Sequence, residues 1–260
     1  MRSSSTAFYT LALVPLAASG PLKGFSSLVS RINIARPKIG TVPYNADITA
    51  CNVPGTVALT YDDGPGPYTE ELLQILESNN VKATFFINGN NGQGPITDNG
   101  FARVIKKAYD DGHQIASHTW SHADLAHLST EERTREMTQL EDALESIIGV
   151  IPTYMRPPYT SCEADCMQDM DDLGYHVANY NIDTRDWAGD YNFAREVYSS
   201  ALSSSSPSSA GFIELTHDIH AETVHTFTQF MIDEAREHGY KLVTLGECLG
   251  DPVSNWYRKS

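Results

Sequence analysis

The stretch Thr56-Val57-Ala58-Leu59-Thr60-Tyr61-Asp62-Asp63-Gly64-Pro65 sets the interpretation of the whole sequence. Its run of apolar and β-branched residues predicts a buried strand, which leads into two adjacent aspartates and is ended by a Gly-Pro turn. Adjacent side chains of a strand point to opposite faces, so neighbouring carboxylates can reach one site only where the strand ends and twists. Taken alone, the Asp-Asp-Gly-Pro segment is also favourable composition for an ordinary acidic turn. Groups that converge on the two carboxylates would favour a site over a turn.

Helix-like and strand-like segments alternate from this stretch onward. Apolar residues at helical spacing, a capping box at Ser129 and terminating glycines predict helices over residues 68–80, 101–111, 129–148, 164–173, 193–203 and 223–238. Short apolar runs predict strands over residues 83–87, 114–117, 154–156, 176–182, 211–215 and 242–245. About seven β/α repeats in series predict a single α/β domain whose parallel sheet curls into a distorted (β/α)7-type barrel.

The composition is that of an acidic globular protein. The 260 residues are 41% hydrophobic and 20% charged, and the net charge is −15. The sequence has no basic cluster to follow a phosphate backbone, which argues against a nucleic-acid partner. The length suits one sizeable core, and no shift in composition marks a second domain.

The two ends of the chain are expected to differ from the repeat region. Arg2, the apolar residues 7–18 and a small-residue exit are typical of a secretory signal peptide, expected over residues 1–20. Residues 21–50 show no sustained period and are interpreted as a pro-segment or N-terminal arm. The repeats occupy residues 51–250, and residues 251–260 form a C-terminal tail without the hydrophobic run of a lipid anchor. We therefore expect a secreted, extracellular monomer with no membrane anchor.

Four cysteines fit a secreted protein and allow three disulfide pairings. Cys51 and Cys248 flank the repeat region, and Cys162 and Cys166 share one loop, so these two bridges are favoured. A zinc site built from the four cysteines is the alternative, which their spacing disfavours.

Polar residues follow almost every predicted strand, and the carboxyl ends of parallel strands share one face. Besides Asp62 and Asp63, these ends carry the segments 117–122 (Ser-His-Thr-Trp-Ser-His), 156–159 (Arg-Pro-Pro-Tyr), 183–187 (Asp-Thr-Arg-Asp-Trp) and 214–218 (Glu-Leu-Thr-His-Asp). His118 and His122 have the spacing that puts two imidazoles on one side of a helical turn, as metal sites require. Surface helices often carry such a pair, so the pair alone is a weak signal. An acidic residue from a neighbouring strand end would make it a His2Asp set, the pattern of a catalytic zinc site.

These segments resemble, in order, the five motifs of the polysaccharide deacetylases, also called carbohydrate esterase family 4 or the NodB-homology domain. The motifs are Thr60-Tyr61-Asp62-Asp63-Gly64-Pro65, His118-Thr119-Trp120-Ser121-His122, Arg156-Pro157-Pro158-Tyr159, Asp183 to Trp187 and Leu215-Thr216-His217. The resemblance spans roughly residues 51 to 250, which would make this region a NodB-type catalytic domain. With its secretion signal and its Cys162/Cys166 loop, the chain is most similar to secreted fungal chitin deacetylases. Tyr61 stands where phenylalanine is commoner in the family.

The resemblance implies a hydrolase that removes N-acetyl groups with the help of one divalent metal, zinc as the first expectation and cobalt as the second. By this likeness Asp63, His118 and His122 would hold the metal. Asp62 would be the general base, kept ionised and aimed by Arg156.

The same likeness assigns the other side of the site. His217 would be the general acid, oriented by Asp186 or, as the weaker candidate, by Asp183. The positions implied in substrate binding are the backbone N–H of Tyr159, the pocket walls Trp187 and Leu215, and Asp183.

Chitin or a chito-oligosaccharide is the expected substrate, converted to chitosan and acetate. Activity as an acetylxylan esterase or a peptidoglycan deacetylase is an alternative on the same scaffold. A non-catalytic, metal-containing carbohydrate-binding protein is a further alternative, which the intact pair of Asp62 and His217 disfavours because binding needs neither a base nor an acid. The histidines outside the motifs are expected at surface or capping positions: His113, His127, His176, His220, His225 and His238.

Overall fold

The computed structural model describes residues 36–260. The expected signal peptide and the first part of the expected arm, up to residue 35, lie outside the described residues. Within the described part, no helix is both long enough and apolar enough to cross a membrane.

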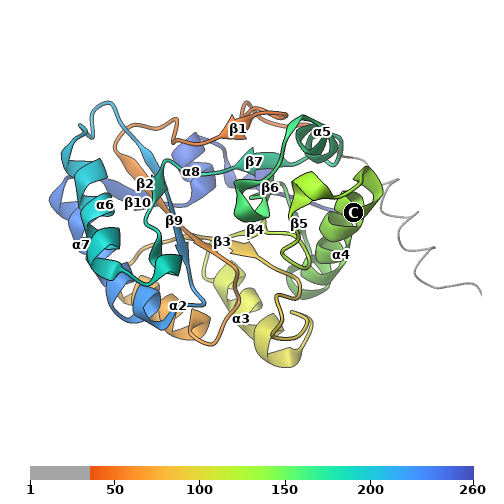
Figure 1. The fold of residues 1–260 in the computed structure, drawn as a ribbon, viewed down its shortest axis with the longest axis horizontal. Helices are drawn as coiled ribbons and strands as arrows, with labels where there is room; N and C mark the ends of the chain where they lie inside the picture. Colours follow the sequence, from red (N-terminus) through yellow and green to blue (C-terminus); the bar gives the residue numbers. More distant parts are fainter. Residues whose placement is uncertain (1–35) are drawn as a thin grey trace, which may run out of the picture. The chain divides into compact units, whose positions relative to one another are not determined.

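A curled sheet of nine parallel strands forms the centre of the part of the chain that the structure describes (Figure 1). Its strands are β1 (Asp47–Ile48), β2 (Thr56–Asp62), β3 (Thr84–Ile87), β4 (Gln114–Ser117), β6 (Tyr154–Met155), β7 (His176–Ala178), β8 (Ile182–Asp183), β9 (Phe212–His217) and β10 (Lys241–Val243). They pair in the order β1-β7-β6-β4-β3-β2-β9-β8, and β10 pairs with the first half of β2. The short strands β5 (Ile151–Pro152) and β11 (Tyr257–Arg258) pair antiparallel to each other.

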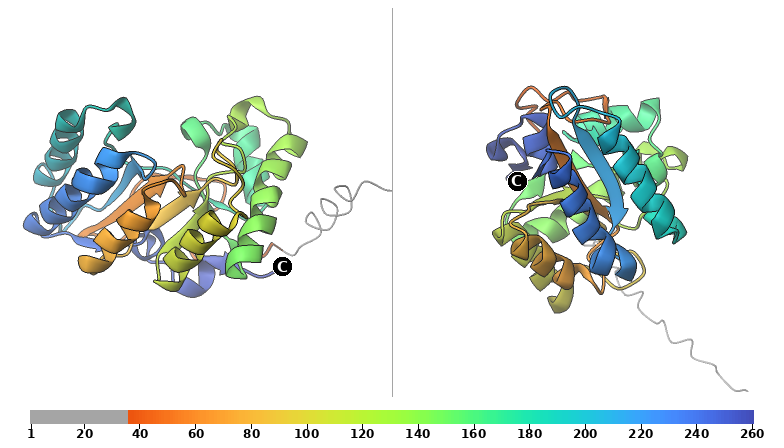
Figure 2. Two further views of the ribbon diagram at one scale, coloured as in Figure 1. Left: turned by 90° about the horizontal axis from the view of Figure 1, so that it is seen from below. Right: turned by 90° about the vertical axis from the view of Figure 1, so that its left-hand side faces the viewer.

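Helices cover the outside of this sheet (Figures 1 and 2). They are α2 (Thr69–Ser78), α3 (Asn99–Asp110), α4 (Thr130–Ile148), α5 (Ala164–Asp172), α6 (Tyr191–Ser203) and α7 (Thr228–Glu237). The short helix α8 (Leu245–Leu249) instead packs with the residues that fill the inside of the curled sheet. A π-helical turn, η4 (Thr223–Phe227), leads into α7. The capping box predicted at Ser129 is confirmed, because Ser129 Oγ accepts from the backbone N–H of Glu132 at the start of α4. This arrangement confirms a single α/β domain with a curled parallel sheet.

The side chains of β2 show how the sheet separates two layers of core. Val57, Leu59 and Tyr61 pack with apolar residues of the outer helices, whereas Ala58 packs with the residues that fill the inside of the curled sheet. All seven residues of β2 are buried, as its apolar sequence predicts. Asp62 lies on the same side of the strand as Ala58, so its carboxylate points into the curve of the sheet.

The predicted strand over residues 176–182 is wrong as a single element. It divides into β7, which pairs with β6, and β8, which pairs with β9 at the opposite edge of the sheet. Residues 179–181 cross between the two edges: Asn179 N donates to Ile48 O at 2.8 Å, and Asn181 N donates to Ile213 O at 3.1 Å. Residues 179–181 therefore bridge the two edges of the curled sheet, which are not joined by a regular ladder of hydrogen bonds.

Both ends of the described chain pack onto the domain. Residues 47–48 form β1, an edge strand on β7, and Arg36 donates to the buried carboxylate of Glu141 on α4 at 2.7 Å. Arg258, in the expected tail, donates to the same carboxylate at 2.7 Å. Trp256 is buried against residues that fill the inside of the sheet. Residues 36–50 and 251–260 thus take part in the packing of the barrel.

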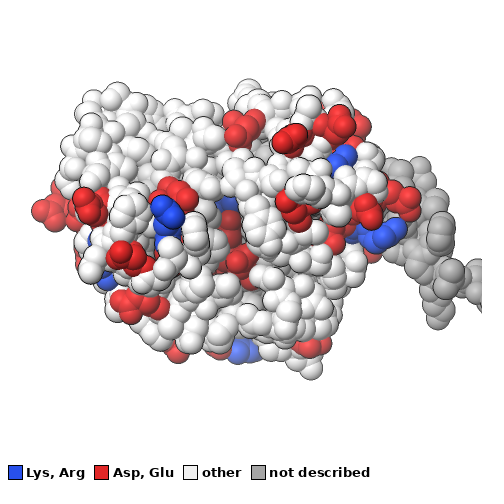
Figure 3. Space-filling model, in the orientation of Figure 1, with Lys and Arg blue, Asp and Glu red and all other residues white. Residues whose placement is uncertain are grey.

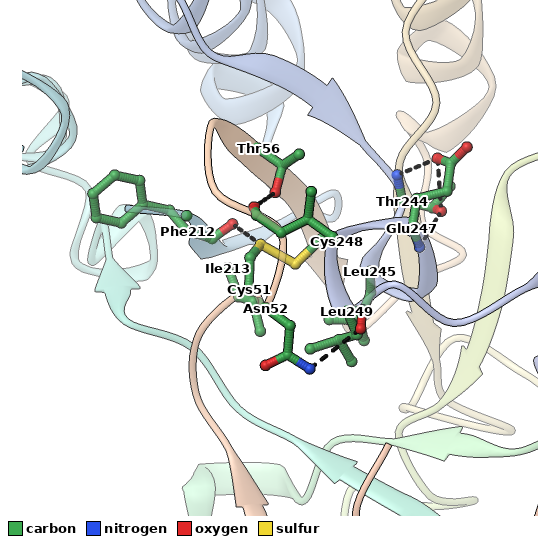
Figure 4. The surroundings of a disulfide bond; sticks show 12 residues. Cys51, Asn52, Thr56, Phe212, Ile213, Thr244, Leu245, Glu247, Cys248 and Leu249 are labelled. Carbon is green, nitrogen blue, oxygen red and sulfur yellow. Dashed lines mark hydrogen bonds between the residues drawn. A yellow bond between two sulfur atoms is a disulfide. The ribbon is translucent and has the colours of Figure 1, made fainter. Parts of the chain in front are cut away.

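Two disulfides join the four cysteines in the favoured pattern. Cys51 is bonded to Cys248, which ties the chain just before β2 to helix α8 (Figure 4). Cys162 is bonded to Cys166 at the start of α5. With both pairs closed, no cysteine is free for a zinc site of the kind considered above.

Candidate active site

The end of β2 turns its two aspartates toward one cavity. Asp62 continues the alternation of the strand, but Asp63 has a positive φ of 72°, which rotates its side chain away from the face that a regular strand would give it. Both residues line a cavity of about 520 Å³. The expectation that adjacent carboxylates converge only beyond a strand end is therefore confirmed.

Asp63 lies beside two histidines in an arrangement that suits a metal ion. Its Oδ1 atom is 3.6 Å from His118 Nε2 and 3.2 Å from His122 Nε2. One ligand atom from each of the three residues can be chosen so that all lie within 4.8 Å of one another. The buried Oδ1 of Asp63 accepts no hydrogen bond from the described residues. Two nitrogen donors and one carboxylate are ligands that a divalent zinc-type cation accepts, so the set fits a metal that keeps an open position.

The surroundings of the two imidazoles favour their use as ligands. The Nδ1 atom of His118 is 2.8 Å from the carbonyl oxygen of Arg156, a contact that fixes the ring and leaves Nε2 facing Asp63. Burial, and then the charge of His118, lower the pKa of His122. A neutral imidazole is the form that binds a metal.

The helical turn expected for residues 118–122 is wrong. These residues form an irregular loop after β4, with positive φ values at Thr119 (70°) and His122 (57°). The same spacing of four residues brings the imidazoles together because the loop reverses direction tightly, and the two rings meet at a centroid distance of 5.1 Å.

Two residues that the motifs do not include hold this loop. Asn88, which follows β3, donates from its side chain to the carbonyl oxygens of His118 and Thr119. Glu136 on α4 accepts from Ser121 N at 2.7 Å and from Ser121 Oγ at 2.8 Å, and its own carbonyl accepts from Trp120 N at 3.1 Å. Non-glycine residues at positive φ are strained, and these contacts keep them in place.

Arg156 holds the carboxylate of Asp62 from the buried side of the cavity. The arginine is 1% exposed, and its Nη1 donates to Asp62 Oδ1 at 2.8 Å and to Thr60 Oγ1 at 2.7 Å. Its Nε and Nη2 donate to the carbonyls of Ala178 and Asn179, both at 3.0 Å. All three guanidinium nitrogens of Arg156 thus donate hydrogen bonds to the protein. Because Arg156 binds Asp62 Oδ1, the other oxygen, Oδ2, points toward the cavity, 3.7 Å from His118 Nε2.

His217 is paired with Asp186 and not with Asp183. Its Nδ1 lies 2.8 Å from Asp186 Oδ1, and the other carboxylate oxygen accepts from His217 N at 2.8 Å and from Thr223 Oγ1 at 2.7 Å. Asp183 instead accepts from the backbone N–H of Arg185. Burial alone would lower the pKa of His217, but the hydrogen bond to Asp186 and nearby carboxylate charges raise it to about 9.

The remaining predicted site residues lie on the wall of the same cavity. Tyr159 has a left-handed backbone (φ 58°), and its ring meets that of His122 at 4.7 Å. Trp187, Leu215 and Asp183 complete the set. The cavity is also lined by Pro157 of the third motif and by Thr160 and Tyr180, which the motifs do not include.

Asp218, which follows His217 at the end of β9, has no role assigned from the motifs. It is fully buried, its Oδ2 accepts from Thr69 Oγ1 at 2.6 Å, and burial raises its pKa to about 7. A Cβ atom on Gly64 would lie 2.5 Å from its carboxylate oxygens. The turn after Asp63 therefore needs glycine, because Asp218 fills the space beneath it.

Of the histidines outside the motifs, two differ from the expected surface or capping positions. His113 and His176 are buried, and the Nδ1 of His113 accepts from the backbone N–H of Ala83 at 3.1 Å. Burial lowers the pKa of His113 to about 4, so it is neutral. His220 lies near His217, with ring centroids 5.9 Å apart, and is not one of the three clustered ligands.

Comparison with known proteins gives the same family as the motifs. The profile of a family described as polysaccharide deacetylase matches residues 49–178. A chitin deacetylase of Pestalotiopsis sp is 47% identical over 237 residues, covering 90% of this chain and 78% of that protein. A probable peptidoglycan-N-acetylglucosamine deacetylase of Arthroderma benhamiae is 46% identical over 218 residues, covering 84% of this chain and 49% of that protein.

A solved structure has a similar fold over most of its length. The chitin deacetylase of Colletotrichum lindemuthianum superposes with a TM-score of 0.81 at 44% sequence identity, covering 84% of this chain and 97% of that chain. These relatives, together with the curled parallel sheet, identify the protein as a hydrolase of the α/β class. The chain belongs to the polysaccharide deacetylase family.

Proposed function

We propose that this enzyme is a metal-dependent deacetylase of N-acetylglucosamine polymers or oligomers, which converts chitin to chitosan and acetate. The observation that carries the proposal is the convergence on one cavity of three kinds of group. These are the candidate ligands Asp63, His118 and His122, the Arg156-paired carboxylate of Asp62, and the Asp186-paired imidazole of His217.

The metal site fits a single divalent cation, with zinc expected first and cobalt second. When bound, such a cation supplies a water molecule of lowered pKa and polarises the carbonyl of the acetamide. The residues of this chain then have to move protons and hold the substrate.

Asp62 is placed to accept a proton from the attacking water. Its free oxygen faces the cavity next to the candidate ligands, while the other oxygen is held by Arg156. The buried guanidinium donates a charge-assisted hydrogen bond to this carboxylate and fixes its direction, as the role of a general base requires.

His217 is placed to donate a proton to the amine that leaves. Its Nδ1 faces Asp186, so Nε2 is the atom available to the cavity. Asp186 stabilises the protonated ring and orients it, as a carboxylate does for a catalytic histidine elsewhere. A divalent cation nearby would reduce this stabilisation and bring the pKa of His217 down from about 9 toward neutrality.

The walls of the cavity would bind the acetyl group and the sugar. The backbone N–H of Tyr159 is the proposed donor to the developing oxyanion. Leu215 and Trp187 offer an apolar surface to the acetyl methyl, and Asp183 offers an acceptor to sugar hydroxyls.

Two features support chitin over the alternatives. The relative from Pestalotiopsis and the solved structure from Colletotrichum lindemuthianum are both named chitin deacetylases. The relative from Arthroderma benhamiae is named for peptidoglycan, so peptidoglycan is the second candidate, and an acetylated xylan is the third. We further propose that the protein is secreted and acts as a monomer, with a signal peptide over residues 1–20 and its catalytic domain over residues 51–250.

Acetate release tests the proposal directly. Wild-type protein is incubated with chitin oligomers, peptidoglycan and acetylxylan, before and after dialysis against a chelator and after adding zinc or cobalt. We expect release from chitin oligomers, loss on chelation and return with either metal. Full activity after exhaustive chelation would refute metal dependence, and the absence of acetate from every substrate would favour a non-catalytic binding protein.

A further inference from the structure

An exposed arginine next to the cavity has no charged partner. Arg185 forms no ion pair, and its side chain donates no hydrogen bond, within residues 36–260. The chain has a net charge of −15, and within residues 36–260 most Lys and Arg side chains are paired with carboxylates. Acidic side chains are also the more frequent charged groups on the face shown in Figure 3. Arg195 and Arg236 also lack an ion pair, but both donate hydrogen bonds from their side chains, so Arg185 is distinguished among the described arginines by its free N–H donors.

Arg185 is held in place by two aromatic rings. Its guanidinium carbon lies 5.2 Å from the ring centroid of Trp187 and 5.8 Å from that of Phe193 on α6. The residue also has a left-handed backbone, with φ 56°. Stacking between aromatic rings orients a guanidinium while leaving its N–H groups free to donate.

The two rings are themselves unusually exposed. Trp187 is 53% exposed and Phe193 is 42% exposed, and both are among the few large hydrophobic residues at the surface of the described chain. Trp187 lines the cavity, whereas Phe193 does not. Phe193, Arg185 and Trp187 therefore form a continuous strip that begins at the cavity wall and leads away from it; we call it the 185–193 strip.

We infer that the 185–193 strip is a binding site for a further sugar unit of the polymer, adjacent to the unit that reacts. This inference rests on the proposed function and extends it beyond the reacting unit. Sugar rings present C–H faces to aromatic side chains and hydroxyl or acetamide oxygens to hydrogen-bond donors. The strip offers both: apolar ring surface from Phe193 and free N–H donors from Arg185.

The occupant follows from continuity with the cavity. A polymer whose one unit fills the cavity beside Trp187 must leave it along some surface, and the strip is the exposed aromatic surface that shares Trp187 with the cavity wall. A neutral sugar also suits the site. Its hydroxyl and acetamide oxygens can accept hydrogen bonds from Arg185 without displacing a protein partner.

Binding as a function of chain length tests the inference. Zinc-loaded Asp62→Asn protein binds chitin oligomers of two to six units without turnover, and calorimetry gives the affinity for each. Phe193→Ala and Arg185→Ala are then added to this background. We expect unchanged affinity for the shortest oligomer that binds and a loss of about five-fold for longer ones, the size of one stacking contact.

Helix α6, which carries Phe193, also provides a matched control. Arg195 also stacks on aromatic rings, with its guanidinium carbon 4.7 Å from the centroid of Phe230, but it does not line the cavity. Arg195→Gln should leave the affinity for every oligomer unchanged. Arg185→Lys keeps the charge without the planar stack and should lose most of what Arg185→Ala loses.

The outcomes separate this inference from the proposed function. Equal affinities of wild-type and strip variants at every length would overturn the inference, as would an equal loss at every length. Wild-type protein that binds longer oligomers through the strip but releases no acetate would refute the proposed function and leave the strip as a sugar-binding site.

Discussion

Two sets of residues line the cavity. In the first, Asp62 and His217 each contact a buried partner, Arg156 and Asp186, whose remaining hydrogen bonds go to neighbouring backbone and hydroxyl groups. In the second, Asp63 Oδ1 lies between two imidazole nitrogens and accepts no hydrogen bond from the described residues. In the first set, which we call the proton-transfer side, each proposed acid or base has a protein partner. The second set, which we call the metal side, brings together the electron-pair donors that we propose as ligands of the metal.

This difference indicates where each side is sensitive. The proton-transfer side depends on pairs, so a change to one partner alters the charge and direction of the other. The metal side consists of three proposed ligands and the loop that carries two of them, so we expect a change there to alter metal occupancy. Substitutions on the two sides should therefore be separable by measuring metal content beside activity.

The largest effect is expected where one variant from each side is compared. His118→Ala should lose the metal and all measurable acetate release, because it removes a proposed ligand. Asp62→Asn should keep the metal and lose activity by about 10³-fold, because it removes the proposed base. Metal content by mass spectrometry and turnover of chitin oligomers check this. His225→Ala, an exposed histidine that contacts Glu71, is the control and should match wild type. Equal metal loss in both variants would contradict the division into two sides.

Asp186→Asn should come next, with a loss of activity of about 10²-fold and the metal retained. The variant removes the carboxylate that raises the pKa of His217, so burial then dominates and the pKa falls. NMR titration of the His217 ring in chelator-treated protein gives that pKa directly. Asp183→Asn is the comparison, because its carboxylate does not contact His217, and it should leave the pKa unchanged. A His217 pKa that is the same in Asp186→Asn and wild type would contradict the pairing.

Stability against pH gives a smaller effect from the same pair. The pKa of His217 is about 9 when folded, above the usual value of about 6.5 when unfolded. Its contribution is therefore complete below pH 6.5 and is lost as pH rises through 9. On the order of 3 kcal/mol is at stake in metal-free protein. Urea unfolding of wild type and His217→Gln should show their largest difference near pH 6 and little pH-dependent difference near pH 10. A gap that widens with pH would contradict the sign.

The smallest effect is expected from Glu136, which acts on the metal side through the loop. Glu136→Ala removes both side-chain bonds to Ser121, and we expect about a ten-fold loss of zinc affinity with turnover restored at saturating zinc. Glu136→Gln keeps an acceptor and should lose less. Zinc affinity measured by competition with a chelating dye checks this. A loss of turnover that excess zinc does not restore would place Glu136 on the proton-transfer side.

Much of the fold could be predicted from local sequence signals. Alternating apolar runs gave most of the helices and strands, and the capping box placed the start of α4. The exception at residues 176–182 has a physical cause: the apolar run continues, but its hydrogen-bond partners change from one edge of the sheet to the other. β1 was also missed, because two residues show no period of their own and depend on β7 for their pairing.

The candidate site was predicted mainly through ionisable residues. Asn88 was not predicted, because the prediction rested on ionisable residues and an amide carries no charge. Its side chain nevertheless donates to two carbonyls of the 118–122 loop. The contact of Glu136 with the loop was not predicted, because a glutamate in the middle of a helix has the same sequence pattern as a solvent-exposed one. The loop itself was misjudged as helical, since a spacing of four residues does not distinguish a helical turn from a tight loop with positive φ.

The two disulfides also impose an order of events on synthesis. Cys51 and Cys248 are separated by 197 residues, which ribosomes take on the order of 10–40 s to add. During that interval Cys162 and Cys166 are the first thiols to follow Cys51 along the chain. Their separation of four residues makes each the nearest thiol to the other along the chain, and their bonding to each other removes them as wrong partners. Where oxidation accompanies synthesis, early closure of the short bridge would leave Cys51 without a competing thiol until α8, which carries Cys248, has been made.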